Sequence, residues 1–159
     1  MKKLFFILFL LVGYSNMTNA QILAFKPTTG DAEMDGILTD IHNKAIKDIS
    51  GFTSNVVSTF SLVHSKVEAA LKILAPGDVF MAAQVASTVN KPFDEVVKSY
   101  QANKLKGWGA MAKELGIKPG SPEFHAMKKS MKSKGNSGNK GNGNSGGKGN
   151  GNAGKGKKK

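Results

Sequence analysis

The stretch GWGAMAKELGIKPGSPEFHAMKK, residues 107–129, decides how the last part of the chain folds. Its apolar residues recur at spacings of three and four on both sides of a polar centre, which predicts two amphipathic helices joined by a turn. Gly116 fits the end of the first helix because glycine adopts a positive φ without strain. Ser121 and Pro122 fit the N-cap and the first position of the second helix. The residues predicted to face inward are Trp108, Met111, Ala112, Leu115, Phe124, Met127 and Met131.

The same periodicity predicts helices upstream of this stretch. One begins near Asp31, carries acidic residues in its first turn, and continues through apolar positions to Ile49. Gly51 interrupts the pattern, and residues 52–63 then resume it, although their β-branched residues also suit a strand. Ser65 and Glu68 form a capping-box pattern that starts a further helix, which the Pro-Gly pair at 76–77 ends.

Residues 78–89 are apolar nearly all round, which predicts a central, buried helix. Residues 93–100 carry an apolar face at helical spacing, and residues 103–106 link them to the stretch at 107–129. The fold class predicted is therefore all-α, a compact bundle of five to six short helices over residues 31–131 with a C-terminal helix-turn-helix-like unit. A lead-in loop, residues 21–30, precedes this domain. The chain has no cysteine, so its stability must come from an apolar core.

The first twenty residues have the pattern of a signal peptide. Lys2 and Lys3 precede an apolar run, residues 4–12, that is too short to span a bilayer, and Thr18-Asn19-Ala20 supplies small residues for cleavage after Ala20. We expect export from a bacterial cytoplasm to the periplasm or the extracellular space. After cleavage, no integral membrane span is expected.

The positive charge is concentrated at the C-terminus. All 23 basic residues are lysine and the net charge is +12, yet residues 21–131 hold 13 lysines against 11 acids. The lysine-rich tail, residues 132–159, holds eight lysines, no acid and mostly Gly and Asn, a composition that predicts disorder. Such a cation binds polyanions without sequence preference; a solubilising tail with no partner has the same composition. The predicted polyanion-binding residues are Lys132, Lys134, Lys140, Lys148, Lys155, Lys157, Lys158 and Lys159.

The residue types that could carry chemistry do not form a convergent set. The acids of Asp31–Gly36 resemble the start of a calcium loop, but position twelve falls on His42 where a bidentate Glu is needed, so an acidic helix start is favoured. His42, His64 and His125 lack metal-ligand spacing, and Asp94 and Glu95 point in different directions on a helix. We predict no enzyme, no catalytic or metal residues and no cofactor. Trp108 between two glycines suits stacking on sugars or bases, but its helical spacing favours a core anchor.

Two resemblances bear on this segment. The pattern GWGxxAKELGIKPGSxEFH, from Gly107 to His125, resembles a family of small exported bacterial helical proteins of unknown function, and residues 76–82 and 91–97 also fit. That resemblance implies a signal peptide and a helical domain, and it supplies no activity. The segment is also similar to the helix-turn-helix of LuxR-type regulators. The matching positions are Ala112, Leu115, Ile117, Ser121 and His125, and Glu123, Phe124 and Lys128 would lie nearest the bases.

The function predicted is that of an exported, non-enzymatic interaction protein of the cell envelope or extracellular space. Its tail would bind anionic envelope polymers, lipids or extracellular nucleic acid non-specifically. The alternative is a nucleic-acid-binding protein that uses the helix-turn-helix-like unit and the tail. A third possibility is an undetected hydrolase or a carbohydrate binder that uses Trp108. A specific partner of the domain is expected at Trp108, Lys113, Glu114, Lys118, Glu123 and His125.

Overall fold

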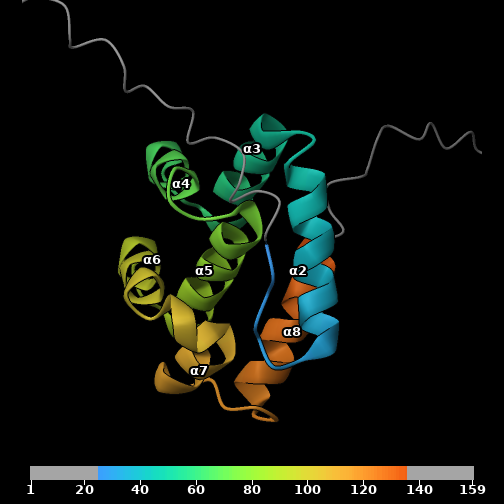
Figure 1. The fold of residues 1–159 in the computed structure, drawn as a ribbon, viewed down its shortest axis with the longest axis vertical. Coiled ribbons are helices and arrows are strands. Elements are labelled where there is room, and N and C mark those ends of the chain that lie inside the picture. The colour runs from blue at the N-terminus through green and yellow to red at the C-terminus, as the bar shows by residue number, and fades with distance from the viewer. Residues whose placement is uncertain (1–24, 136–159) are drawn as a thin grey trace, which may run out of the picture.

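A computed structural model of the chain describes residues 25–135. The predicted signal peptide, residues 21–24 and the tail beyond Gly135 lie outside the described residues. The all-α prediction is confirmed, with seven α-helices in the described part rather than five or six (Figure 1). These are α2 (Ala32–Ala45), α3 (Ile49–Phe60), α4 (His64–Leu71), α5 (Pro76–Val89), α6 (Phe93–Ala102), α7 (Gly107–Glu114) and α8 (Pro122–Gly135), with a 3₁₀ turn, η1 (Lys104–Lys106), between α6 and α7.

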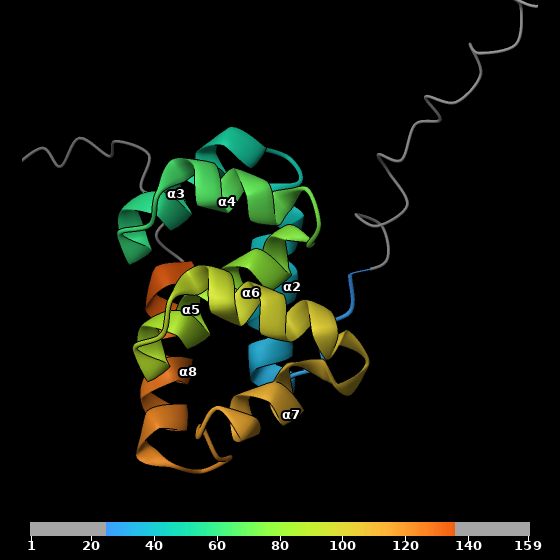
Figure 2. The same ribbon diagram turned by 90° about the vertical axis from the view of Figure 1, so that its left-hand side faces the viewer.

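The helix α5 is the centre of the fold, as its apolar sequence predicts. Its first eleven residues are buried, and α2, α3, α4, α6 and α8 all pack against it (Figures 1 and 2). The prediction that Pro76-Gly77 ends the preceding helix is wrong. Pro76 occupies the first position of α5, where its missing N–H has no intrahelical partner to lose. Asn90, with φ of 52°, ends the helix.

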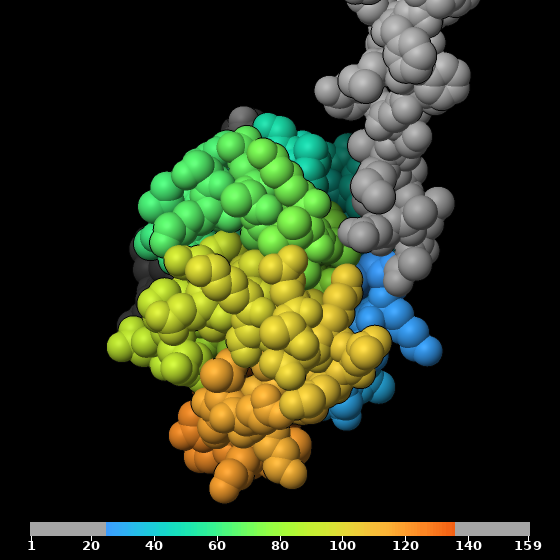
Figure 3. All heavy atoms as spheres, turned by 60° about the vertical axis from the view of Figure 1, so that its left-hand side comes forward, coloured from blue at the N-terminus to red at the C-terminus, as the bar shows by residue number. Residues whose placement is uncertain are grey.

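The other helices cover α5 in groups. The helices α3 and α4 cover one end, and α6 and α7 follow along the same side of the molecule (Figure 3). The helices α2 and α8 lie side by side on another side of α5 (Figure 1). The extended residues 25–30 run beside α5 and α2 before α2 begins. The face predicted for residues 93–100, comprising Phe93, Val96, Val97 and Tyr100, is buried in full.

Two helix starts agree with the sequence. The Asp31 carboxylate accepts a hydrogen bond from the Met34 N–H at 2.9 Å, and the Ser121 hydroxyl accepts one from the Phe124 N–H at 3.2 Å. Gly116 has the positive φ expected of a residue that ends a helix, 95°. Gly116 and Ser121 therefore take the predicted positions at the two ends of the α7–α8 connection.

Two other starts differ from the sequence expectation. The helix α4 begins at His64 with Val63 as N-cap, so Ser65 lies inside the helix and the predicted capping box does not form. The break between α2 and α3 falls at residues 46–48 and not at Gly51. Asp48 caps α3 by accepting from the Gly51 N–H at 2.8 Å. A Cβ at position 51 would overlap only the Asp48 carboxylate, the end of an exposed side chain that can move.

The C-terminal boundary of the domain is also corrected. The helix α8 continues to Gly135, past the boundary predicted at residue 131. Its last turn is held by the folded domain, since Lys132 forms an ion pair with Glu33, and Lys134 Nζ lies 4.2 Å from the centre of the Phe60 ring. Lys132 and Lys134 are thus parts of a helix and not of a disordered tail.

Candidate functional site

The predicted partner surface divides into buried and exposed parts. Lys113, Glu114, Lys118, Glu123 and His125 are exposed around the α7–α8 connection, as a binding surface requires. Trp108 does not belong to this surface, because it is completely buried. The prediction that Trp108 presents itself to a partner is therefore wrong, and the core-anchor interpretation is confirmed.

Trp108 is fixed by a buried polar and aromatic cluster. Its indole Nε1–H donates to Asp78 Oδ1 at 2.7 Å, and its ring stacks on Tyr100 with centroids 3.8 Å apart and planes 11° from parallel. Burial raises the pKa of the Asp78 carboxyl, and hydrogen bonds from Trp108 and Tyr100 oppose this rise. Burial and the nearby Asp78 carboxylate raise the pKa of the Tyr100 hydroxyl. The cluster joins α5, α6 and α7.

Sequence reasoning did not identify Asp78 as a member of this cluster. The available signal was that Asp78 is the only ionisable residue in the mostly apolar segment 76–89. A charged side chain in a segment buried all round needs a partner. An indole N–H is a donor that commonly finds such a partner when buried. Asp78 and Trp108 are 30 residues apart in the sequence, so no local pattern indicates that they form a pair.

The glycines that flank Trp108 are explained by the lead-in segment. The Gly109 N–H donates to the Thr28 carbonyl oxygen at 3.0 Å. A Cβ at Gly109 would overlap the Thr29 carbonyl oxygen, and a Cβ at Gly107, whose φ is 75°, would overlap the Thr28 side chain. The two glycines let residues 28–29 lie directly against α7.

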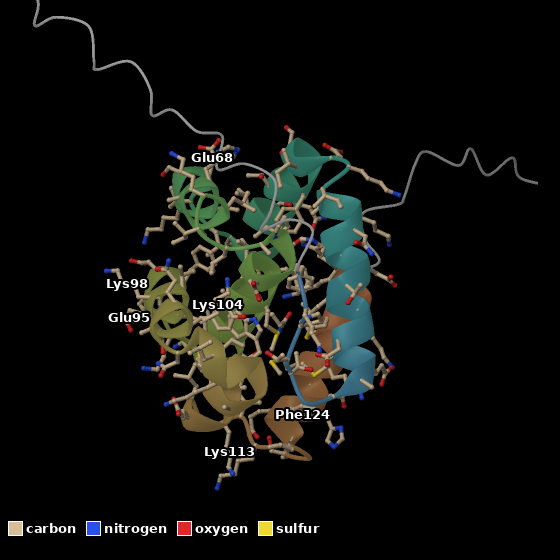
Figure 4. The ribbon with its side chains drawn as sticks, viewed as in Figure 1. Glu68, Glu95, Lys98, Lys104, Lys113 and Phe124 are labelled. Carbon is tan, nitrogen blue, oxygen red and sulfur yellow. The ribbon has the colours of Figure 1, made fainter. Side chains whose placement is uncertain are left out.

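An open groove lies where these segments meet. It encloses about 620 Å³ and is lined by residues 28–31, by one face of α7, by the Pro119-Gly120 turn and by Phe124. Lys106 and Lys113 lie along its α7 side, and Lys106 is paired with Glu114 at 3.2 Å. Lys113 extends into solvent at this end of the molecule (Figure 4). The groove places two exposed lysines, one of them paired with Glu114, and one half-buried aromatic ring beside several small residues.

A lysine of α8 forms ion pairs with the acidic start of α2. Lys128 Nζ lies 2.8 Å from Asp31 Oδ2 and 2.6 Å from Glu33 Oε2. Asp31 and Glu33 raise the pKa of Lys128, and hydrogen bonds from Lys128 lower the pKa of both carboxyls. Asp35 Oδ1 accepts from the Thr29 hydroxyl at 2.6 Å. The Asp31–Gly36 segment is thus an acidic helix start held by neighbouring donors, as favoured over a calcium loop.

The three histidines lie apart. His42 is buried in α2 and stacks on Phe25 at 4.4 Å, His64 pairs with Glu68 at 3.5 Å, and His125 meets the Phe124 ring edge to face. Within residues 25–135, no three His, Cys, Asp or Glu residues are placed to share a metal ion. None of the helices in that range combines the length and apolar content needed to cross a bilayer.

No family model, curated protein or solved structure matches the chain.

Proposed function

We propose that the protein is an exported, non-enzymatic protein that binds anionic surfaces or polymers through its C-terminal lysines. The observation that carries this proposal is the segregation of charge: residues 132–159 contain eight lysines and no acid. A cationic segment of this kind displaces counterions from any polyanion, and its affinity depends on charge rather than sequence. Lysine without arginine favours diffuse attraction over bidentate recognition.

Contacts in the folded domain show which of the C-terminal lysines remain for a partner. Lys132 and Lys134 contact Glu33 and Phe60 within the fold, which leaves six lysines, at 140, 148, 155, 157, 158 and 159, for an anionic partner. Because Lys128 and Lys132 pair α8 with the start of α2, the six lysines follow a helix that is fixed to the domain. Binding by these lysines would then hold the folded domain at the anionic partner, where the domain could make a second contact.

Base recognition by α8 is less well supported than charge binding. In the helix-turn-helix alternative, Lys128 would face the bases, but its Nζ is held between Asp31 and Glu33. The first turn of α8 exposes an acid, Glu123, which in that alternative would lie near the bases. A carboxylate there opposes the approach of phosphates.

The test compares the protein from Gln21 onward with a form that ends at Gly135. Ending at Gly135 retains the whole of α8 and its ion pairs, whereas ending at residue 131 would remove Lys132 and Lys134 from the fold. A matched control keeps the length and replaces the six later lysines by glutamine. We expect both altered proteins to lose binding to double-stranded DNA and to an acidic polysaccharide, while their circular dichroism stays unchanged. Full binding by either one would contradict the proposal.

A further inference from the structure

The turn η1 exposes an apolar residue in a way that no other part of the described fold does. Leu105 has an exposed fraction of 105%, so the whole residue is open to solvent. The other large exposed apolar residues, Ile46, Ile49, Val63 and Ile73, range from 42% to 59% and keep part of their surface packed. Single exposed apolar residues are ordinary on protein surfaces, so exposure alone does not mark a contact. A fully exposed leucine at the tip of a projecting turn is not needed by the fold.

The tip is also cationic. Lys104 and Lys106 flank Leu105 and are both exposed. Lys106 shares its charge with Glu114, at 3.2 Å across a solvent-exposed pair; such pairs are weak and easily exchanged for another anion. An apolar side chain between two lysines matches the boundary of an anionic bilayer, where acyl chains lie just below negatively charged headgroups.

The tip is presented on a fixed support. The Lys106 N–H donates to the Asn103 carbonyl at 2.8 Å, and the Asn103 side-chain amide donates to the Ser99 carbonyl at 3.1 Å. On either side of η1, Tyr100 and Trp108 stack on each other inside the core. The link between α6 and α7 bends outward at the edge of the molecule (Figure 2). These contacts support the backbone of the turn that exposes Leu105.

We propose that the Lys104-Leu105-Lys106 tip is a membrane contact that inserts Leu105 into the interface of an anionic bilayer. The proposal rests on the proposed function, since the C-terminal lysines bring the protein to the anionic surface. It also specifies that this surface is a lipid bilayer. A soluble polyanion gives an exposed leucine nothing to bury, whereas a bilayer removes it from water. The α6–α7 link and α8 lie at opposite edges of the domain in Figure 2. The 24 residues after Gly135 can span at most about 80 Å, enough to reach the same surface.

The first experiment uses the absence of cysteine. Leu105→Cys and the control Val63→Cys each give a single site for an environment-sensitive NBD label. The protein begins at Gln21, because the apolar residues 4–12 would themselves enter vesicles. With phosphatidylglycerol–phosphatidylcholine vesicles, we expect the label at position 105 to brighten and shift to the blue. The label at position 63 should not change. An aqueous spectrum at position 105 on protein that sediments with the vesicles would overturn the proposal and leave charge-driven binding intact.

The second experiment separates lipid from soluble polymer. Leu105→Gln should lower affinity for the anionic vesicles about tenfold, because a leucine is no longer withdrawn from water, and should leave affinity for double-stranded DNA unchanged. An equal loss for DNA, or no loss for vesicles, would contradict a lipid contact. If the unaltered protein binds DNA but no vesicles, the proposed membrane contact is contradicted and the proposed binding of polyanions stands. If it binds neither, the proposed function fails as well.

Discussion

Replacement of Gly109 by alanine should separate the lead-in segment from α7. The new Cβ would overlap the Thr29 carbonyl oxygen and lie 3.0 Å from its carbonyl carbon. Both atoms belong to backbone, so relief requires residues 28–29 or α7 to move. The move breaks the hydrogen bond from the Gly109 N–H to Thr28, worth about 0.5–1.5 kcal/mol. Overpacking strain adds roughly 1–3 kcal/mol. The higher helix propensity of alanine offsets about 0.5–1 kcal/mol of this loss in stability.

The expected net loss in the free energy of unfolding is roughly 1–3 kcal/mol. Urea unfolding followed by Trp108 fluorescence measures it, because this single tryptophan lies beside the altered position. Gly36→Ala is the matched control, since Gly36 also lies inside a helix but no atom lies within 4 Å of an added Cβ. We expect that control to stabilise the protein by about 0.5–1 kcal/mol. Equal stabilisation by Gly109→Ala would refute the reasoning.

Two further predictions concern the buried carboxylate and the helix caps. Asp78→Asn keeps an oxygen that can accept from Trp108 and removes a charge that burial penalises. Because the folded-state pKa of Asp78 is raised, its ionisation costs stability as the pH rises from its ordinary value of 3.8 through the folded-state value. The stability of the variant relative to the parent should therefore increase over that window in urea unfolding at a series of pH values; a constant or decreasing difference would contradict this. Ser121→Ala should lower the free energy of unfolding by about 1 kcal/mol, because it removes the cap of α8. Ser65→Ala should lower it little, since Ser65 does not cap α4. Equal losses for the two variants would show that Ser65 does act as a cap.

The periodic parts of the fold were accessible from sequence. Apolar spacing predicted the buried face of α6 and the burial of α5, because each requires only that one stretch of chain be apolar in the right pattern. The turn between α7 and α8 was also local, since Gly116 and Ser121 act on their own neighbours. Local rules succeeded where the partner of a residue lies within a few positions along the chain.

Several of the features that were missed depend on contacts between distant residues. Asp78 meets Trp108 across 30 residues, and Lys128 meets Asp31 across 97. No local pattern reports such pairs. The Ser65 cap failed for a different reason. The Lys66 N–H bonds the Val63 carbonyl at 3.0 Å, which starts α4 before Ser65 can occupy the N-cap.

The candidate site shows the same division. The exposed residues Lys113, Lys118 and Glu123 were identified by elimination, once the apolar positions around them had been assigned to the core. The groove beside them was not predicted, because one of its walls is the lead-in segment from the other end of the chain. Leu105 also escaped notice, since a leucine between two lysines in a short link has no periodicity to compare.

The salt dependence of polyanion binding tests the central claim most directly. The logarithm of the affinity for double-stranded DNA is measured against the logarithm of salt concentration, with and without the residues after Gly135. If the six lysines beyond α8 all contact phosphates, the slope should approach about −5, and removal of these residues should bring it close to zero. A slope that stays the same without them would place the binding in the folded domain and contradict the proposed function.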